Sequence, residues 1–253
     1  MHPARIAELL EPFLSPTPAP CQSEVLNPCP SESGQRPGEE TAVLSSSQLQ
    51  SISTYIDILL RWNARVNLTA IRDPEDIVTR HFGESLFAAR HLFPVPPSVS
   101  SVSSVVKAFD SLADLGSGAG FPGLPIKLWA PHVSLTLIES NHKKAAFLRE
   151  VTRALTLTNV NIQNARAETL TTTFDVVTLR AVERFEAILP AAAALLAPAG
   201  RLALLISTPQ QAQARSTLPH LVWSHPVPIP HSRSRILLLA NRPDQAAEAE
   251  PNI

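Results

Sequence analysis

A glycine-rich stretch, DLGSGAGFPG at residues 114–123, contains the residue types that most directly suggest chemistry. It follows a short apolar run and precedes a helical pattern, so the chain must turn tightly there. Gly116 and Gly118 tolerate positive φ and present no Cβ, which lets the backbone approach a bound ligand closely. The segment 118–123 also matches G-x-G-x-x-G, a pattern that by itself is weak and compatible with a dinucleotide. The stretch therefore predicts a cofactor loop.

Acidic residues at the ends of two expected strands help to name the cofactor. Asp114 lies two positions before Gly116, where its carboxylate would repel a pyrophosphate and attract a cationic sulfonium. This arrangement favours S-adenosylmethionine over a dinucleotide. Glu139 ends the next strand, where an acid can accept hydrogen bonds from both ribose hydroxyls of either cofactor. The alternative for Glu139 is an ordinary solvated charge at the end of a strand.

The elements that position these residues begin at about residue 110, where short apolar runs alternate with longer helical patterns. Such alternation is typical of a parallel sheet flanked by helices. Right-handed crossovers then give a doubly wound α/β domain over residues 110–242. The expected strands are Ser111–Leu115, Ser134–Glu139, Asn159–Gln163, Phe174–Leu179, Arg201–Ile206 and Arg235–Ala240, and the expected helices between them include Asn141–Leu155 and Arg184–Leu196.

The chain before this domain is expected to be helical. Apolar residues recur at helical spacing over residues 1–14 and again over residues 45–66. Asp73 and Pro74 supply an N-cap and a first-turn proline for a further helix. We therefore expect an N-terminal helix followed, after a linker, by a helical region at residues 43–109.

Two segments are expected to be disordered. Residues 15–42 are rich in Pro, Ser, Glu and Gly, so burial cannot offset the entropy of ordering them. Residues 243–253 form a short acidic tail. A further stretch, residues 92–109, is expected to be the loop that joins the helical region to the α/β domain.

Composition indicates a globular chain, since 44% of the 253 residues are hydrophobic and 17% are charged. No uncharged apolar run reaches about 18 residues, and Glu8 and Glu11 interrupt the stretch where a signal peptide would need continuity. We therefore expect a cytoplasmic protein that does not enter a membrane. Cys21 and Cys29 lack a second Cys or His pair at zinc spacing, which indicates neither a disulfide framework nor a metal site.

Charge is unevenly distributed, although the formal net charge is only -1. Residues 1–41 carry two Arg and six Glu, and residues 243–253 carry three acids, so residues 42–242 retain 19 basic and 13 acidic residues, a net charge of +6. The acid-free run at 201–242 contains Arg201, Arg215, Arg233, Arg235 and Arg242, and the expected helix at 141–155 contains Lys143, Lys144, Arg149 and Arg153. These residues either flank the cofactor cleft as a phosphate-facing surface, or merely solubilise the protein.

Several motifs together resemble a known family. They are WNARVNLTA at 62–70 followed by Asp73-Pro74, HFGESL at 81–86, DLGSGAGFPGLPI at 114–126, FLREV at 147–151, ARAE at 165–168 and LRAV at 179–182. Over residues 45–207 the sequence resembles the bacterial small-subunit ribosomal RNA methyltransferase G family, also called glucose-inhibited division protein B.

The resemblance implies a Rossmann-like class I S-adenosylmethionine-dependent methyltransferase, an α/β fold with a mainly parallel sheet and an N-terminal helical extension. It implies transfer of a methyl group from S-adenosylmethionine to N7 of one guanosine in the 530 loop of 16S rRNA. The expected partner is 16S rRNA or the small ribosomal subunit, and the expected enzyme is a monomer.

The resemblance also implies cofactor contacts at Gly116, Phe121, Ala167 with Glu168, and Arg180. Phe121 can close an apolar wall, Ala167 can offer backbone polar groups to the adenine edge, and Glu168 can accept from an amino group. Arg180 suits the methionine carboxylate or an RNA phosphate. The plainer alternatives are a core phenylalanine at 121 and a surface acid at 168.

No general acid or base is expected, because guanine N7 has an exposed lone pair and needs only alignment with the methyl group. Candidates for the RNA side are Arg65, Asn67 and His81. The alternatives are a helix C-cap for Asn67 and a packing role for His81.

The sequence also departs from the family pattern. The usual Lys-Gly after the fifth strand is absent, Glu84 replaces an Asp, and Gly83 weakens its helix by up to ~1 kcal/mol. A methyltransferase for another RNA or a small molecule, and a non-enzymatic RNA-binding assembly protein, therefore stay open.

Overall fold

The structure is a computed structural model that describes residues 1–15, 43–94, 109–182 and 184–244. Almost all of the expected linker at 15–42, most of the expected joining loop and most of the acidic tail lie outside these ranges, as do Cys21 and Cys29.

A single sheet forms the centre of the molecule, with strand order β3-β2-β1-β4-β5-β8-β6 and β7 paired to β8. The parallel strands are β1 (Ser111–Leu115), β2 (Ser134–Ile138), β3 (Val160–Gln163), β4 (Phe174–Arg180) and β5 (Leu196–Ser207). The antiparallel strands are β6 (Val222–Trp223), β7 (Val227–Pro228) and β8 (Arg235–Asn241). The expected Rossmann-like α/β fold is confirmed.

Strand β5 begins at Leu196 instead of the expected Arg201. Leu196 pairs with Phe174, and the register then shifts so that Arg201 pairs with Val176. The intervening residues 197–200, APAG, contain the proline and glycine that conceal a strand in the sequence.

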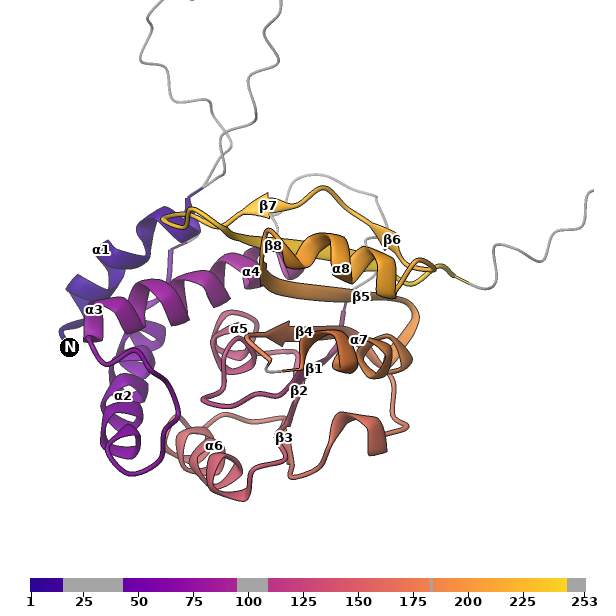
Figure 1. Cartoon of the computed structure of the whole chain (residues 1–253). Coiled ribbons are helices and arrows are strands. Elements are labelled where there is room, and N and C mark those ends of the chain that lie inside the picture. The colour runs from indigo at the N-terminus through magenta and orange to yellow at the C-terminus, as the bar shows by residue number, and fades with distance from the viewer. Residues whose placement is uncertain (16–42, 95–108, 183, 245–253) are drawn as a thin grey trace, which may run out of the picture.

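Helices cover both faces of the sheet (Figure 1). The buried residues of α5 (Gly123–Trp129) and α6 (His142–Ala154) pack on one face, and those of α7 (Phe185–Ala194) and α8 (Gln210–Thr217) pack on the other. Side chains alternate along each strand, so Leu112 of β1 joins the first cluster while Ala113 joins the second.

The N-terminal helices pack on the same face as α5 and α6. They are α1 (Pro3–Leu14), α2 (Ser46–Asn63), α3 (Pro74–Asp76), the π-helix η1 (Ile77–Gly83) and α4 (Glu84–Leu92). Their apolar residues share one core with residues of β1, β2, β4, β5 and β8. The helical extension is therefore built into the core of the α/β domain.

The helix expected after Asp73 exists, but its central part, Ile77–Gly83, is π-helical. The Asp73 carboxylate accepts hydrogen bonds from the amides of Glu75 (2.9 Å) and Asp76 (3.0 Å), as the N-cap prediction requires. The helical turn then widens into the π-helix η1, and π-helical turns are frequent at functional sites.

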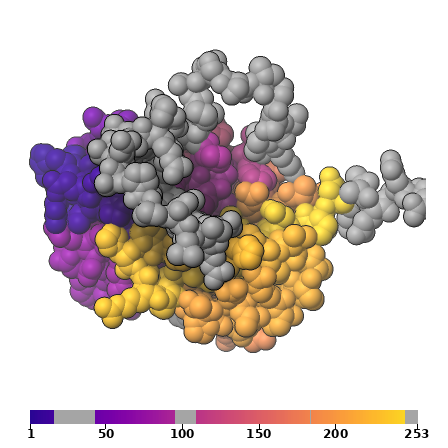
Figure 2. Space-filling view, turned by 90° about the horizontal axis from the view of Figure 1, so that it is seen from above, coloured from indigo at the N-terminus to yellow at the C-terminus, as the bar shows by residue number. Residues whose placement is uncertain are grey.

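Helix α1 explains the glycine at position 83. A Cβ on Gly83 would lie 2.6 Å from Cε2 of Phe13, a buried ring on α1. Phe13 also lies 5.8 Å from the ring of His231, in the turn before β8. Figures 1 and 2 show the N-terminal helix beside this C-terminal turn. Gly83 thus lets the first helix pack closely against the π-helix.

Candidate active site

The glycine loop connects β1 to α5 at the carboxyl edge of the sheet, where the strand order reverses between β1 and β4. Gly116, Gly118 and Gly120 have φ angles of 65°, 54° and 86°, which glycine adopts without strain. A Cβ on Gly118 would have no neighbour nearer than 3.7 Å, and one on Gly116 would only touch Val182 at 3.5 Å. The loop therefore leaves an uncovered backbone surface that a ligand can approach closely.

Tyr55 of α2 supports this loop from the interior. Its hydroxyl donates a hydrogen bond to the carbonyl oxygen of Ala119, and burial raises the pKa of Tyr55, so the donor keeps its proton. A Cβ on Gly120 would lie 2.4 Å from the same hydroxyl. Sequence reasoning missed Tyr55 because a tyrosine in an amphipathic helix carries no signal beyond its apolar position.

The Asp114 carboxylate points into the protein, not toward the cofactor side. It is fully buried, and it accepts hydrogen bonds from the Thr178 hydroxyl (2.9 Å) and the Gly123 amide (3.2 Å). Burial raises the pKa of Asp114 to about 7. The expected direct attraction of a sulfonium finds no support in this geometry; Asp114 instead ties the start of α5 to β4.

Glu139 lies where the sequence placed it, at the carboxyl end of β2. Its carboxylate accepts from the amides of Gly118 (2.9 Å) and Asn141 (2.7 Å). Each carboxylate oxygen has a second lone pair, so both can still accept a hydroxyl. Glu139 therefore orders the glycine loop and retains capacity for a ribose.

Ala167 and Glu168 begin the short 3-10 helix η2 (Ala167–Thr169), which follows β3. The Asn164 side chain donates to the carbonyl oxygens of Glu139 (2.8 Å) and Ser140 (3.0 Å), which holds this segment beside the end of β2. Ala167 is buried and Glu168 is exposed. The structure thus gathers Gly116, Gly118, Glu139, Ala167 and Glu168 at one edge of the sheet.

The Phe121 ring packs in the core instead of forming a pocket wall. It is 6% exposed and stacks between Tyr55, with ring centroids 5.4 Å apart, and His81, at 4.6 Å. The plainer interpretation, a core phenylalanine, describes its side chain.

Arg180 ends β4 and is engaged within the protein. Its guanidinium donates to Nδ1 of His81 (3.0 Å), to the carbonyl oxygen of Arg80 (2.6 Å) and to the Glu84 carboxylate (3.0 Å). Its side chain is 8% exposed. The expected contact of Arg180 with a ligand carboxylate or phosphate finds no support in this arrangement, in which Arg180 joins the sheet to the π-helix.

His81 is a neutral packing and hydrogen-bonding residue. A guanidinium can only donate, so Nδ1 of His81 accepts from Arg180, and the ring proton on Nε2 is donated to the Thr69 hydroxyl oxygen (2.8 Å). Burial, and then the charges of Arg180, Arg80 and Arg235, lower the pKa of His81 to about 3. His81 therefore cannot act as a general base in this arrangement.

Comparison with known proteins identifies the family. The family model for rRNA small subunit methyltransferase G (GidB) matches residues 48–220. The chain belongs to this family. It is 38% identical over 180 residues to the ribosomal RNA small subunit methyltransferase G of Xylella fastidiosa (strain 9a5c), a match covering 70% of this chain and 78% of the relative. The protein of the same name from Xanthomonas oryzae pv. oryzae (strain KACC10331 / KXO85) is 38% identical over 176 residues, which is 66% of this chain and 76% of the relative.

Solved structures share the fold of this methyltransferase G family member. Magnesium protoporphyrin IX methyltransferase from Synechocystis PCC 6803, with bound SAM, aligns with a TM-score of 0.54 at 15% identity, covering 80% of this chain and all of that one. Ribosomal protein L11 methylase from Lactobacillus delbrueckii subsp. bulgaricus aligns with a TM-score of 0.50 at 14% identity, covering 64% of this chain and 79% of that one.

The family motif at the end of α2 combines a structural asparagine with exposed polar residues. Asn63 is 5% exposed; its side chain accepts from the amides of Leu68 (2.9 Å) and Thr69 (3.1 Å) and donates to the Thr69 carbonyl oxygen (2.9 Å). Arg65 and Asn67 in the intervening loop are exposed. Asn63, not Asn67, therefore orders the end of the helix, which leaves Asn67 available for a ligand.

The acid-free arginine run does not form one surface in this methyltransferase G chain. Strand β8 runs antiparallel to β5, so Arg235 lies opposite Ser207 at the carboxyl edge, whereas Asn241, next to Arg242, lies opposite Arg201 at the other edge. Arg201 donates to the Asn241 side chain (3.0 Å) and Arg242 to the Leu196 carbonyl oxygen (2.6 Å). Arg215 donates to the Ser224 carbonyl oxygen (2.8 Å). The expectation that the whole run flanks the cofactor cleft is wrong; of its five arginines, Arg233 and Arg235 lie near the cofactor edge.

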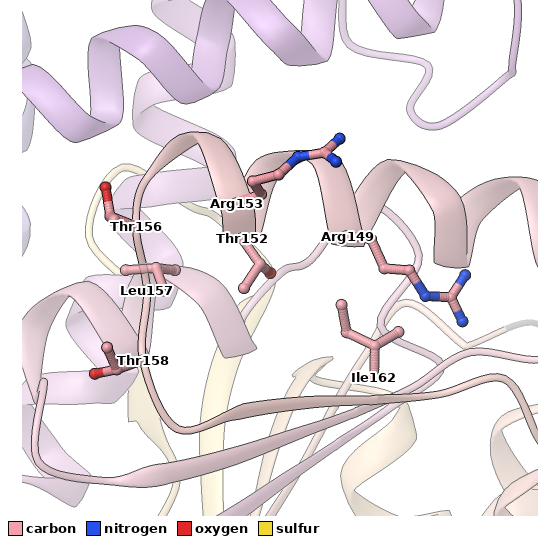
Figure 3. A pocket seen from close by; sticks show the side chains of 7 residues that line it. All are labelled: Arg149, Thr152, Arg153, Thr156, Leu157, Thr158 and Ile162. Atoms are coloured by element: carbon pink, nitrogen blue, oxygen red, sulfur yellow. The ribbon is translucent and has the colours of Figure 1, made fainter.

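A shallow pocket of about 370 Å³ lies under the C-terminal half of α6 (Figure 3). Thr152, Leu157 and Ile162 contribute to its wall, and the guanidinium groups of Arg149 and Arg153 extend outward from α6. Because α6 runs from the carboxyl edge of β2 back toward the start of β3, this pocket lies away from the glycine loop. Among the helices of the described ranges, none has the length and apolar character that a membrane crossing requires.

Proposed function

We propose that the chain transfers the methyl group of S-adenosylmethionine to N7 of a guanosine in the 530 loop of 16S rRNA. As a member of the methyltransferase G family, it is an S-adenosylmethionine-dependent rRNA methyltransferase. The observation that carries the proposal is the open glycine loop with Glu139 beside it, at the switch point of the sheet in a chain of this family. We also propose that it acts as a monomer in the cytoplasm, where its ribosomal substrate is found.

The residues at the carboxyl edge fit this cofactor. Gly116 and Gly118 present open backbone, Glu139 retains lone pairs for the ribose hydroxyls, and Ala167 with Glu168 follows β3 where an adenine edge would lie. When bound, S-adenosylmethionine supplies an activated methyl group on a sulfonium. The protein contributes binding, orientation and exclusion of water.

The titratable groups near this edge support a target that needs no deprotonation. Asp114 is buried and hydrogen-bonded, His81 is neutral with both ring nitrogens engaged, and Glu84 is paired with two arginines. A neutral guanine N7 carries its own lone pair, so attack on the methyl group requires alignment alone.

The test uses purified protein, methyl-labelled S-adenosylmethionine and small ribosomal subunits from a strain that lacks this enzyme. Methylated 16S rRNA is cleaved chemically at N7-methylguanosine and the break is mapped by primer extension. We expect one break, in the 530 loop, and none with a Gly116→Val variant that remains folded. A methyl group on another atom or in another rRNA region would contradict the proposal.

A further inference from the structure

A charged cluster lies where the π-helix meets the ends of β4 and β8. Its single carboxylate, Glu84, is 3% exposed and bonds to Arg180 at 3.0 Å through Oε2 and to Arg235 at 2.8 Å through Oε1. Arg80 lies beside it, since its carbonyl oxygen accepts from Arg180 and its charge acts on His81. Two guanidinium groups, those of Arg180 and Arg235, pair with this one carboxylate. With the nearby charge of Arg80 and a neutral His81, the cluster has two positive charges in excess.

The excess charge belongs to Arg80 and Arg235. Arg180 is 8% exposed and its donors are engaged by His81, Arg80 and Glu84. Arg235 uses one terminal nitrogen for Glu84, and its side chain is 27% exposed. The Arg80 side chain is exposed and has no hydrogen bond or ion pair among the described residues. Both arginines therefore keep donors that face solvent.

This cluster adjoins the glycine loop. His81 stacks at 4.6 Å on Phe121, the residue that follows Gly120. Arg180 is two residues before Val182, the side chain nearest to an added Cβ on Gly116. Arg80 is on a π-helix, a form whose widened turn is frequent at functional sites. An anion held here would lie next to the proposed cofactor loop.

We propose that Arg80 and Arg235 bind a backbone phosphate of the RNA substrate, and that Glu84 positions Arg235 for this contact. The inference rests on the proposed function, which makes RNA the substrate. Guanidinium groups match phosphate oxygens in charge and geometry, and a phosphate would neutralise part of the excess charge. Glu84 holds one end of the Arg235 guanidinium and leaves its remaining N–H groups for the ligand.

The test compares Arg80→Gln, Arg235→Gln and the double variant with Arg153→Gln as a matched control. Arg153 is also an exposed arginine, but it lies near the C-terminal end of α6, away from the glycine loop. Affinity for a 16S rRNA transcript is measured at several salt concentrations, and affinity for S-adenosylmethionine by calorimetry. Each lost phosphate contact removes about 0.7 to 0.9 from the slope of log affinity against log salt. Because both arginines contact the same phosphate, we expect one such loss for the double variant, no change for Arg153→Gln, and unchanged cofactor affinity throughout.

The experiment distinguishes failure of the phosphate site from failure of the proposed function. An unchanged slope for the double variant, with wild-type methylation intact, overturns the phosphate site and leaves the proposed function standing. Loss of S-adenosylmethionine affinity with an unchanged slope assigns the arginines to the cofactor carboxylate and also overturns the phosphate site. A wild-type protein that neither binds nor methylates the rRNA overturns both proposals. Arg80→Gln removes no intramolecular partner, so its result does not depend on folding.

The positioning role of Glu84 has its own readout. Glu84→Gln should raise KM for rRNA with little change in kcat. Glu84→Asp should raise KM less, because a shorter carboxylate can still pair with Arg235. A lower melting temperature with KM unchanged would indicate a purely structural residue and overturn this part of the proposal.

Discussion

The indole nitrogen of Trp62, near the end of α2, donates a hydrogen bond of 3.0 Å to the carboxylate of Glu150 on α6. This contact joins the WN motif of the N-terminal helices to the FLREV motif of the α/β domain. Oε1 of Glu150 also lies 3.7 Å from Nη2 of Arg61. Two motifs far apart in the sequence are therefore parts of one packing interface.

Removing this hydrogen bond should destabilise the protein. Trp62→Phe keeps an aromatic ring against Phe147, whose centroid is 5.7 Å away, and removes the donor. We expect a loss of about 1 to 2 kcal/mol in the free energy of unfolding, measured with a denaturant. In a double-mutant cycle with Glu150→Gln, the two losses should sum to more than the loss of the double variant; strict additivity would contradict the contact.

Two alanine substitutions in the glycine loop should have different effects. In Gly120→Ala, the new Cβ would lie 2.4 Å from the Tyr55 hydroxyl and 2.6 Å from Leu124 Cδ1, at a φ of 86°. We expect a loss of roughly 2 to 5 kcal/mol in unfolding free energy from crowding and strain together. In Gly118→Ala the new Cβ meets only the Gly116 carbonyl oxygen, at 3.7 Å, so the change should cost only about 1 to 2 kcal/mol while weakening S-adenosylmethionine binding. Equal stability losses in the two variants would show that the loop packs differently.

For Gly83→Ala, helix propensity and packing predict opposite changes in the free energy of unfolding. Helix propensity alone predicts that Gly83→Ala raises the free energy of unfolding by up to ~1 kcal/mol. The added Cβ would lie 2.6 to 2.8 Å from three atoms of the Phe13 ring, which is 1% exposed and has little freedom to move. We therefore expect a net loss of about 1 to 3 kcal/mol, measured by denaturation. The loss should shrink in a Phe13→Leu background, and a stabilised Gly83→Ala protein would be the opposite of what this packing requires.

Asp114 should make stability depend on pH. Burial raises its pKa from 3.8 to about 7, so the folded state binds this proton more tightly than the unfolded state does. Its stabilising contribution is complete below pH 3.8 and is lost as the pH rises to about 7. His81 has the opposite effect: its pKa is lowered from 6.5 to about 3, so its contribution is present above pH 6.5 and is lost as the pH falls.

The difference between wild type and Asp114→Asn isolates the aspartate. Across this pH range the unfolding free energy of the wild type, minus that of the variant, should decrease as the pH rises. A constant difference would mean that folding leaves the pKa of Asp114 unchanged.

Features that depend on local sequence pattern could be predicted from the sequence. Alternating runs located β1 at Ser111–Leu115 and the other parallel strands to within a few residues, except for the start of β5. Asp73 and Asn141 signalled the starts of their helices, and both accept capping hydrogen bonds. Motif spacing was also enough to indicate the family.

Side-chain direction was not predictable in the same way. Asp114 and Phe121 belong to the loop and Arg180 ends the neighbouring strand β4, but whether each side chain faces the ligand or the core depends on the elements that pack behind it. For Phe121 and Arg180 the packing partners are Tyr55, His81 and Glu84 of the N-terminal extension, which are distant in the sequence. For Asp114 they are Thr178 of β4 and Gly123 of α5. The prediction for the arginines at 201–242 was wrong for a related reason. Strand β8 is antiparallel to β5, so its two ends lie at opposite edges of the sheet.

The single core shared by the N-terminal helices and the sheet also has a geometric consequence for choosing a nucleotide. Arg80 is on a helix packed into that core, and the glycine loop is anchored in the same core through Tyr55. With the proposed phosphate site at Arg80, the span between that site and the glycine loop is therefore fixed and is not adjustable by a hinge. We therefore propose that the enzyme selects its target nucleotide by distance: only a base whose distance and direction from its neighbouring phosphate match that span can be aligned for reaction.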